Sequence, residues 1–394
     1  MKIAITGIGS ISAIGSNVEE SLESLRSSQS GIGPVIGIDH LRKDYLGGQI
    51  KKSDTELKQQ LGIESSELVP RSALLSMVAA KEALGNQSRH AEIRTAVICA
   101  TSVGGMELSE QFYFDMKENE SYDLIQNLST HDNGAGTDLI VDYLNLNCSK
   151  YTVSTACSSA ANAILLGARL IEAGVVDRVL AGGGDALSNF TLNGFDSLMI
   201  YDSEWCKPFD QNRKGLNLGE AAGFVLLENE HSRNLNDSEV LAHVCGWANA
   251  NDSYHQTASS PEGVGATKAI SGALKKAGLN PAEVTYINAH GTATPNNDKS
   301  ESTAFKNIFG TEIPPFSSTK AYTGHTLAAA GGIEAVYSVL ALRENLVFPN
   351  LNFNTSMEEN DFDPQTELLN TEVKYVLSNS FGFGGNSTSL VFSC

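Results

Sequence analysis

The chain has 394 residues, of which 41% are hydrophobic and 19% are charged, a balance that is ordinary for a folded protein and excludes extensive disorder. Its net charge of −19 argues against nucleic acid or an anionic membrane as the main partner. No apolar run reaches membrane-spanning length, and the opening MKIAITGIG resembles a strand rather than a signal peptide, so we expect a cytoplasmic protein. The six cysteines lack CxxC pairs and zinc spacing, so no metal site is expected.

Segments typical of strands alternate with segments typical of helices along the whole chain. Strands are predicted over residues 2–8, 95–101, 151–156, 178–184, 223–228, 241–249, 284–291 and 389–393. Helices are predicted over residues 72–84, 158–174, 266–278 and 331–344. Runs such as AVICA and RVLAG are apolar on both faces, as in sheets covered on each side, so the predicted class is α/β.

Two stretches of the second part of the chain repeat the layout of two stretches of the first. YTVSTACSSAANAILLGARLI and PFSSTKAYTGHTLAAAGGIEAVYSVLAL each place a strand ending in Ser-Thr or Ser-Ser-Thr before a polar turn and an apolar helix. TAVICATSVGG parallels VTYINAHGTAT in the same way. We therefore predict two similar α/β halves, residues 1–240 and 241–394, whose equivalent strand ends meet at one site.

The glycine-rich stretch TGIGSISAIG follows the first predicted strand and raises the possibility of a nucleotide site. Its spacing is not GxGxxG, and no acidic residue ends a second strand at the expected distance. We interpret the stretch as a tight turn. Walker A, GxSxG and HExxH motifs are absent from the sequence.

Cys157 lies between a strand and the predicted helix 158–174. A thiol at a helix N-terminus faces unpaired backbone N–H groups and the positive end of the helix dipole. We expect this setting to lower the pKa of the thiol and to supply donors for the oxyanion of an acyl intermediate.

Two histidines strengthen this interpretation. His290 ends a predicted strand in INAHGTATPNND, and His325 precedes a predicted helix in SSTKAYTGHTLAAAGG. A helix N-terminus disfavours imidazolium, so we expect His325 to stay neutral and to donate one N–H. Two neutral imidazoles facing a thiol could bind a thioester carbonyl and stabilise an enolate.

Five segments in order resemble the β-ketoacyl-acyl-carrier-protein synthases, the elongating condensing enzymes of the type I/II group in the thiolase superfamily. The segments are STACSS at 154–159, KPFDQNRKGLNLGEAAG at 207–223, NAHGTATPNND at 288–298, SSTKAYTGHTLAAAGGIEA at 317–335 and NSFGFGGNS at 379–387. The resemblance implies a thiolase-like fold with a five-layered αβαβα core. It assigns Cys157 to the first half and both histidines to the second.

The resemblance also implies the reaction. An acyl group moves from a carrier protein's phosphopantetheine to Cys157, and malonyl carrier protein then loses CO₂ and attacks it, giving a 3-oxoacyl chain. Such an acyltransferase needs no cofactor of its own, because the carrier protein brings the phosphopantetheine. The expected partners are an acyl carrier protein, malonyl and acyl thioesters, and a second chain, in a homodimer or in a heterodimer with a related ketosynthase-like chain.

Further site residues follow from the resemblance. Lys320 and Glu334 match a buried polar pair beside His290 and His325. The backbone N–H groups of Cys157 and Phe383 match an oxyanion hole, with Phe383 as a gating residue. The substrate-binding positions are Thr292, Thr294, Val103 and Phe381.

Departures from the family bear on the pathway and the docking surface. Ala160 replaces a usual glycine after the cysteine, and residues 122–136 lack the basic pair that often meets the carrier. Arg71, Lys207 and Arg213 remain candidates for docking. The pathway could be fatty acid, polyene or polyketide biosynthesis.

Three alternative functions agree less well with the sequence. A non-catalytic subunit resembling a chain length factor typically lacks the cysteine, which is retained here as Cys157. A degradative thiolase needs a second cysteine in a glycine-rich loop, whereas the GFGGN loop has none and Cys394 is the last residue. A priming synthase with a Cys-His-Asn set is disfavoured because GHTLAAAG supplies a histidine at the third position.

Overall fold

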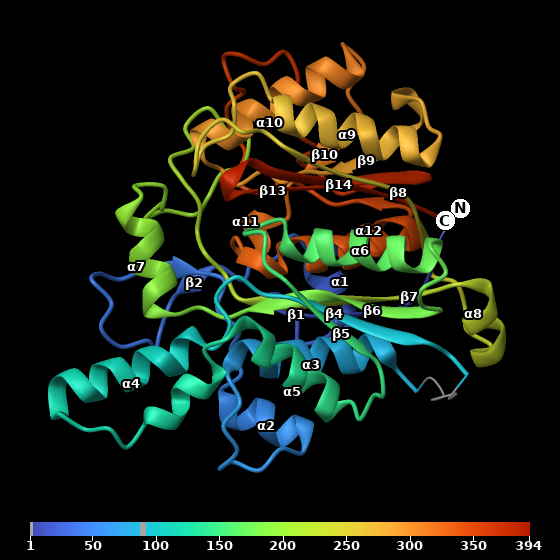
Figure 1. Cartoon of the computed structure of the whole chain (residues 1–394). Coiled ribbons are helices and arrows are strands. Elements are labelled where there is room, and N and C mark those ends of the chain that lie inside the picture. The colour runs from blue at the N-terminus through green and yellow to red at the C-terminus, as the bar shows by residue number, and fades with distance from the viewer. Residues whose placement is uncertain (1–2, 87–91) are drawn as a thin grey trace.

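The computed structural model describes residues 3–86 and 92–394. Its elements stack in five layers, helix, sheet, helix, sheet, helix, which Figure 1 shows from bottom to top. The lower sheet holds β1 (Ile3–Ser12), β4 (Thr95–Ala100), β5 (Ser149–Val153), β6 (Arg178–Asp185) and β7 (Ala221–Glu228). The upper sheet holds β8 (Ala242–Asn251), β9 (Tyr286–Asn288), β10 (Phe316–Ser317), β13 (Tyr375–Gly382) and β14 (Asn386–Ser393). The predicted α/β class with a five-layered core is confirmed.

The two sheets repeat one strand order. The lower sheet runs β5-β4-β6-β7-β1 and the upper sheet runs β10-β9-β13-β14-β8. In each, the first two pairings are parallel and the last two antiparallel. A short pairing of β1 with β8 joins the sheets. This repetition supports two similar halves, while the boundary at residue 240 stays a prediction.

The central layer consists of α6 (Ser159–Glu172) and α12 (Ala330–Glu344), which contact both sheets. α12 is buried from Ala330 to Leu342, because sheet residues and α6 surround it. Its first turn carries two glycines, and a Cβ at Gly332 would lie 2.4 Å from the carbonyl oxygen of Gly223 in β7. The glycine therefore allows helix and strand to approach closely.

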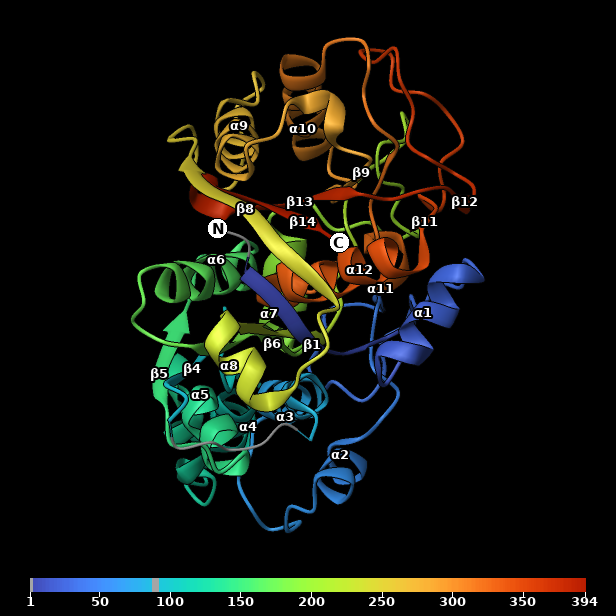
Figure 2. The same ribbon diagram turned by 90° about the vertical axis from the view of Figure 1, so that its right-hand side faces the viewer.

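The outer layers cover the remaining sheet faces (Figures 1 and 2). α3 (Arg71–Leu84) and α5 (Asn133–Tyr143) lie under the lower sheet, and α9 (Val264–Ala277) and α10 (Pro295–Phe309) lie over the upper one. The other helices are α1 (Val18–Arg26), α2 (Asp54–Leu61), α4 (Met106–Asn119), α7 (Asn189–Ser197), α8 (Glu230–Asn236) and α11 (Lys320–Thr323). None of the helices among the described residues has the length and apolarity needed to cross a membrane.

Most predicted elements are present with ends shifted by one to three residues. The predicted helices 72–84, 158–174, 266–278 and 331–344 correspond to α3, α6, α9 and α12. The strand β13 was not predicted, because its sequence YVLSNSFG mixes apolar residues with Ser and Asn. Those polar groups are buried and bonded, as where Ser389 Oγ of β14 donates to Asn379 Oδ1 at 2.8 Å.

Candidate active site

Cys157 sits in the turn between β5 and α6, at the point where the chain enters the central layer. Ala156 before it has φ +52°, a left-handed conformation that turns the chain sharply into the helix. The hydroxyl of Ser159 accepts a hydrogen bond from the N–H of Thr155 at 2.8 Å, and that of Ser158 donates to Asn386 Oδ1 at 2.7 Å. These bonds fix the turn, and Cys157 is only 5% exposed.

The pKa of Cys157 differs from the sequence expectation. Burial raises the pKa of the thiol to about 11, and the charge of Asp185 acts in the same direction. The Lys320 ammonium and the backbone N–H groups of Phe383 and Cys157 oppose this rise. The expected lowering of the pKa was wrong, because desolvation of the sulfur outweighs the helix start and the nearby cation.

The sequence suggested that His325 lies at the start of the central helix, but the structure places it further upstream. It lies between α11 and a 3-10 turn, η3 (Leu327–Ala329), five residues before α12. The N–H of Leu327 donates to His325 Nδ1 at 3.1 Å. Since Nδ1 accepts, the ring proton is on Nε2. Burial first, and then the Lys320 charge, hold the pKa of His325 well below its usual value, so the ring is neutral as expected.

His290 is presented from the end of β9 in a similar state. Its Nδ1 lies 3.2 Å from the Nζ of Lys320, whose ammonium can only donate. Burial and the Lys320 charge hold the pKa of His290 well below its usual value. The carboxylate of Glu301 accepts the backbone N–H groups of His290 and Gly291 at 2.9 and 2.8 Å, which fixes the turn. His290 is thus also neutral, with a free Nε2–H.

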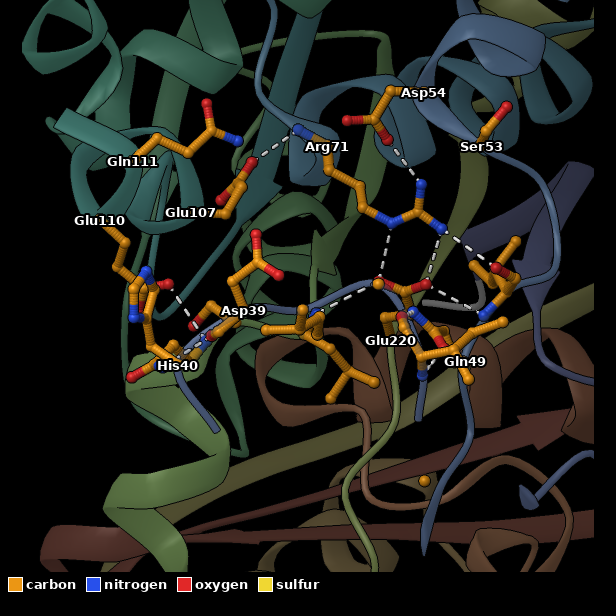
Figure 3. A pocket seen from close by; sticks show the side chains of 18 of the residues that line it. Asp39, His40, Gln49, Ser53, Asp54, Arg71, Glu107, Glu110, Gln111 and Glu220 are labelled. Atoms are coloured by element: carbon orange, nitrogen blue, oxygen red, sulfur yellow. Dashed lines mark hydrogen bonds and ion pairs between the residues drawn. The ribbon is translucent and has the colours of Figure 1, made fainter. Parts of the chain in front are cut away.

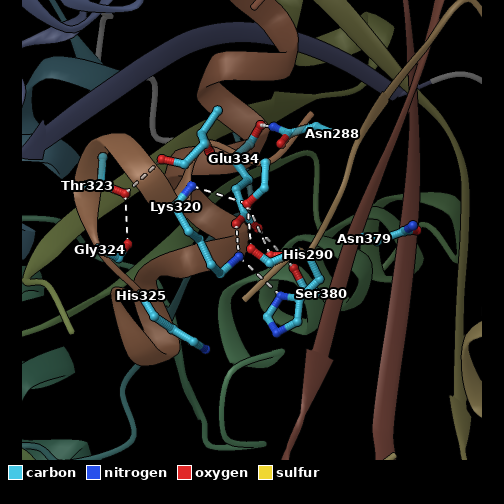
Figure 4. A network of polar contacts seen from close by, with 12 residues as sticks. Asn288, His290, Lys320, Thr323, Gly324, His325, Glu334, Asn379 and Ser380 are labelled. Carbon is cyan, nitrogen blue, oxygen red and sulfur yellow. Dashed lines mark hydrogen bonds and ion pairs between the residues drawn. The ribbon is translucent and has the colours of Figure 1, made fainter. Parts of the chain in front are cut away.

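The two imidazoles lie edge to face beside the buried ion pair of Lys320 and Glu334. Their ring centroids are 5.4 Å apart and their planes cross at 89°. Lys320 Nζ is 2.5 Å from Glu334 Oε1, and both side chains are buried (Figure 4). Lys320 therefore contacts His290 on one side and Glu334 on the other, which matches the predicted polar pair.

Two cavities meet at Cys157. The first, which we call the histidine cavity, has a volume of about 280 Å³ and is lined by Cys157, His290, His325, Thr292, Thr294, Phe381 and Phe383, among others. The second, the apolar cavity, has a volume of about 320 Å³ and is lined by Cys157, Val103, Phe190, Phe195, Leu198, Leu327 and Phe383, among others. Eight of the ten predicted catalytic, oxyanion-hole and substrate-binding residues line these cavities, and the other two, Lys320 and Glu334, lie behind His290.

Phe383 stands between the cavities. It lies in the short turn η4 (Phe383–Gly385), and its ring stacks on Phe195 of α7 with centroids 5.7 Å apart. A Cβ at Gly382 would lie 3.1 Å from the backbone nitrogen of Cys157, so this turn passes close to Cys157. Phe195 was missed by the sequence reasoning, because GFDS carries no chemical signal of its own.

A third cavity lies elsewhere and bears on the docking candidates. It has a volume of about 990 Å³ and does not include Cys157 in its lining (Figure 3). There Arg71 binds Glu220 through two nitrogens, at 2.7 and 2.9 Å, and Asp54 through a third. Arg213 is buried and donates to the backbone oxygens of Asp210 and Pro295. Neither arginine is available for docking, so those two suggestions were wrong.

Comparison with known proteins identifies the family. The family model described as the N-terminal domain of β-ketoacyl synthase matches residues 1–232, and the model of the C-terminal domain matches residues 241–354. The chain belongs to the β-ketoacyl synthase family.

The similarity of this ketosynthase to known relatives extends over its whole length. It is 31% identical to 3-oxoacyl-[acyl-carrier-protein] synthase 2 of Staphylococcus aureus, over 100% of this chain and 98% of that protein. A ketosynthase solved with its chain length factor from Xenorhabdus doucetiae is 33% identical, with a TM-score of 0.86 and coverage of 100% and 98%. The ishigamide ketosynthase/chain length factor is 25% identical, with a TM-score of 0.93 and the same coverage. The predicted family and the predicted condensing acyltransferase activity are confirmed.

Proposed function

We propose that Cys157, His290 and His325 together carry out the decarboxylative condensation of malonyl carrier protein with an acyl group bound to Cys157. The observation that carries this proposal is that one buried thiol and two buried imidazoles, each with its Nδ1 accepting a hydrogen bond, line a single cavity. Burial and the Lys320 ammonium keep the pKa of both imidazoles low, so both rings are neutral, and Glu334 holds Lys320 in place through their ion pair. No step requires a cofactor held by the chain itself.

Acyl loading is a thioester exchange. The sulfur of Cys157 attacks the acyl carbonyl, and the carbon–sulfur bond to pantetheine breaks. The N–H groups of Cys157 and Phe383 stabilise the oxyanion formed in between. Both histidine Nδ1 atoms already accept hydrogen bonds, so the proton of the thiol leaves with the departing pantetheine sulfur. The acyl chain then occupies the apolar cavity beside Val103.

Condensation begins when malonyl thioester enters the histidine cavity. Loss of CO₂ leaves an enolate, and His290 and His325 donate their Nε2–H groups to its oxygen. The enolate carbon attacks the acyl carbonyl on Cys157, a carbon–carbon bond forms and the carbon–sulfur bond to Cys157 breaks. The departing thiolate takes a proton from water. Thr292, Thr294 and Phe381 line the path of the pantetheine arm. The product is a 3-oxoacyl thioester.

Two partners belong to this proposal. An acyl carrier protein brings the substrates, and a second chain, identical or related, covers the exposed apolar residues Phe190 and Leu198 that border the apolar cavity. Lys207 remains a candidate for carrier docking.

Mass spectrometry of the acylated protein tests the proposal. After incubation with an acyl carrier protein, the peptide that contains Cys157 should gain the mass of the acyl group, and Cys157→Ala should gain none. Cys148→Ala, which removes a half-buried thiol outside the two cavities, is the matched control and should load normally. Absence of both acyl-Cys157 and CO₂ release would favour the alternative of a non-catalytic subunit resembling a chain length factor.

A further inference from the structure

Asp185 is a buried carboxylate that the reaction as described does not use. It ends β6, in the sequence RVLAGGGD, and is 0% exposed. Its oxygens accept hydrogen bonds from two different parts of the chain, one following β4 and one following His325. A carboxylate is suited to this place because it accepts at both oxygens.

The first part is the turn after β4. The hydroxyls of Thr101 and Ser102 each donate to Asp185 at 2.5 Å, and the N–H of Ser102 does so at 3.1 Å. Thr101 Oγ1 also accepts the N–H of Gly104 at 3.0 Å, which closes the turn. This turn presents Val103 to the apolar cavity.

The second part is the turn after His325. The N–H of Ala328 donates to Asp185 Oδ2 at 2.9 Å. The preceding residue, Leu327, has φ +53° and places its own N–H on His325 Nδ1 at 3.1 Å. The bond to Asp185 thus fixes the peptide next to the one that sets the tautomer of His325.

We propose that Asp185 is a positioning residue, which holds His325 as the Nε2–H tautomer and, with the same carboxylate, fixes the wall of the apolar cavity at Val103. This proposal rests on the function proposed above, in which His325 donates its Nε2–H to the enolate oxygen. It adds that one carboxylate couples the turn that carries Val103 to His325.

A second effect of Asp185 is electrostatic and distinguishes it from a purely structural residue. The charged groups that act on the Cys157 thiol are Lys320, which lowers its pKa, and Asp185, which raises it. Removing the charge of Asp185 should therefore shift the ionisation of the Cys157 thiol to lower pH.

The variant Asp185→Asn tests the proposal. It keeps the shape of the side chain but replaces one acceptor with an N–H₂ donor, which faces the N–H of Ser102 or Ala328. The rate of CO₂ release from malonyl carrier protein should fall about tenfold or more, since small displacements of a catalytic group have effects of this size. Acyl loading of Cys157 should change less. The nitrogen NMR signals of His325 should lose the Nε2–H pattern.

Asp177→Asn is the matched control. Asp177 is also buried and precedes β6 at its other end, where it binds Arg94 and Asn229. The Asp177→Asn variant should leave the NMR signals of His325 and the pH dependence of Cys157 alkylation unchanged. The Asp185→Asn variant should instead move that alkylation to lower pH. If both variants lower CO₂ release and stability alike, with no shift in alkylation or NMR, the positioning role is wrong.

Two further outcomes separate the proposals. If Asp185→Asn does not fold, Ser102→Ala removes a single hydroxyl from the carboxylate and should still slow CO₂ release more than loading; equal effects on both would overturn the inference. If the unaltered protein releases no CO₂, the proposed function fails. The NMR and alkylation comparisons then still decide whether Asp185 positions His325.

Discussion

At the scale of single residues, the site depends on which ring nitrogens carry protons. Leu327 N–H and Lys320 Nζ each occupy a histidine Nδ1, so both Nε2–H groups are free to donate into the cavity. A protonated imidazole could also donate, but it would cost a buried charge beside the Lys320 ammonium. We therefore propose that the histidines act as neutral hydrogen-bond donors and not as general bases.

The first prediction concerns the pH dependence of decarboxylation. The pKa values of His290 and His325 lie well below their usual value because of burial and Lys320, so both rings stay neutral as the pH falls through about 6.5. The rate of CO₂ release from the acylated enzyme should be flat between about pH 8 and pH 6. A titration of the rate with a midpoint near the usual histidine pKa would contradict this assignment.

The second prediction concerns Lys320. Lys320→Met leaves the carboxylate of Glu334 buried and unpaired, so the free energy of unfolding should fall by about 3–5 kcal/mol in urea titrations. It should also shift alkylation of Cys157 to higher pH, because the ammonium lowers the pKa of that thiol. The double variant Lys320→Met/Glu334→Gln should recover stability but keep the alkylation shift. Recovery of both would show that Lys320 is only structural.

The sequence predicts the location of the proposed reactive residues better than it predicts their ionisation. Cys157, His290 and His325 stand out by residue type and by their place at element ends, and the structure brings all three to one cavity. The pKa of Cys157 depends on desolvation by residues distant in the chain, which a local motif does not reveal. Arg71 was misjudged for the same reason, since its partner Glu220 is 149 residues away.

At the scale of elements, the central helices α6 and α12 set the position of the site. Cys157 precedes α6 and His325 precedes α12, so the contact between these helices brings the two residues together. Small residues make the contact possible: a Cβ at Gly331 would lie 2.7 Å from the backbone nitrogen of Ala161 in α6. The distance between thiol and imidazole thus depends on close helix packing.

The third prediction tests this packing. Gly332→Ala would place a Cβ 2.4 Å from the carbonyl oxygen of Gly223, and overpacking of this kind should cost about 1–3 kcal/mol of unfolding free energy. Gly136→Ala, in α5 where a Cβ meets nothing within 4 Å, should instead stabilise the protein by up to about 1 kcal/mol. Urea unfolding of both variants measures the difference. Equal changes would mean that the central contact tolerates extra volume.

The repeated layout of the two halves was visible in the sequence because turn residues and apolar runs are local. The order of strands within each sheet was not, since β9 pairs with β13 across almost ninety residues of chain. β13 itself was missed because its buried Ser and Asn side chains find their partners only in the folded sheet.

At the scale of the whole molecule, the net charge is −19, so an acidic carrier protein must dock on a local patch of basic residues. Glu204 pairs with Lys207 and Lys214, each at 3.1 Å, and so offsets one of the two positive charges. These lysines belong to a segment whose Ile200 and Leu216 line the histidine cavity. We propose this group of charged side chains as the basic surface that the family resemblance implies.

The fourth prediction concerns these lysines. Glu204→Gln should lower the KM for malonyl carrier protein, because Lys207 and Lys214 become free to meet an acidic partner, and Lys207→Glu should raise it. Both effects should weaken with added salt, since exposed charges are screened. Neither variant should alter the rate with a malonyl-pantetheine substrate that lacks the protein. The same change with both substrates would place the lysines in the site rather than on a docking surface.

The most direct test of the account is a single turnover of enzyme loaded with an acyl group on Cys157 and then mixed with carbon-labelled malonyl carrier protein. The account predicts one equivalent of CO₂ and one labelled 3-oxoacyl carrier for each acyl group lost from Cys157, and far slower release from His290→Ala and His325→Ala although both load normally. Labelled product formed at the normal rate by either histidine variant, or by Cys157→Ala, would contradict it.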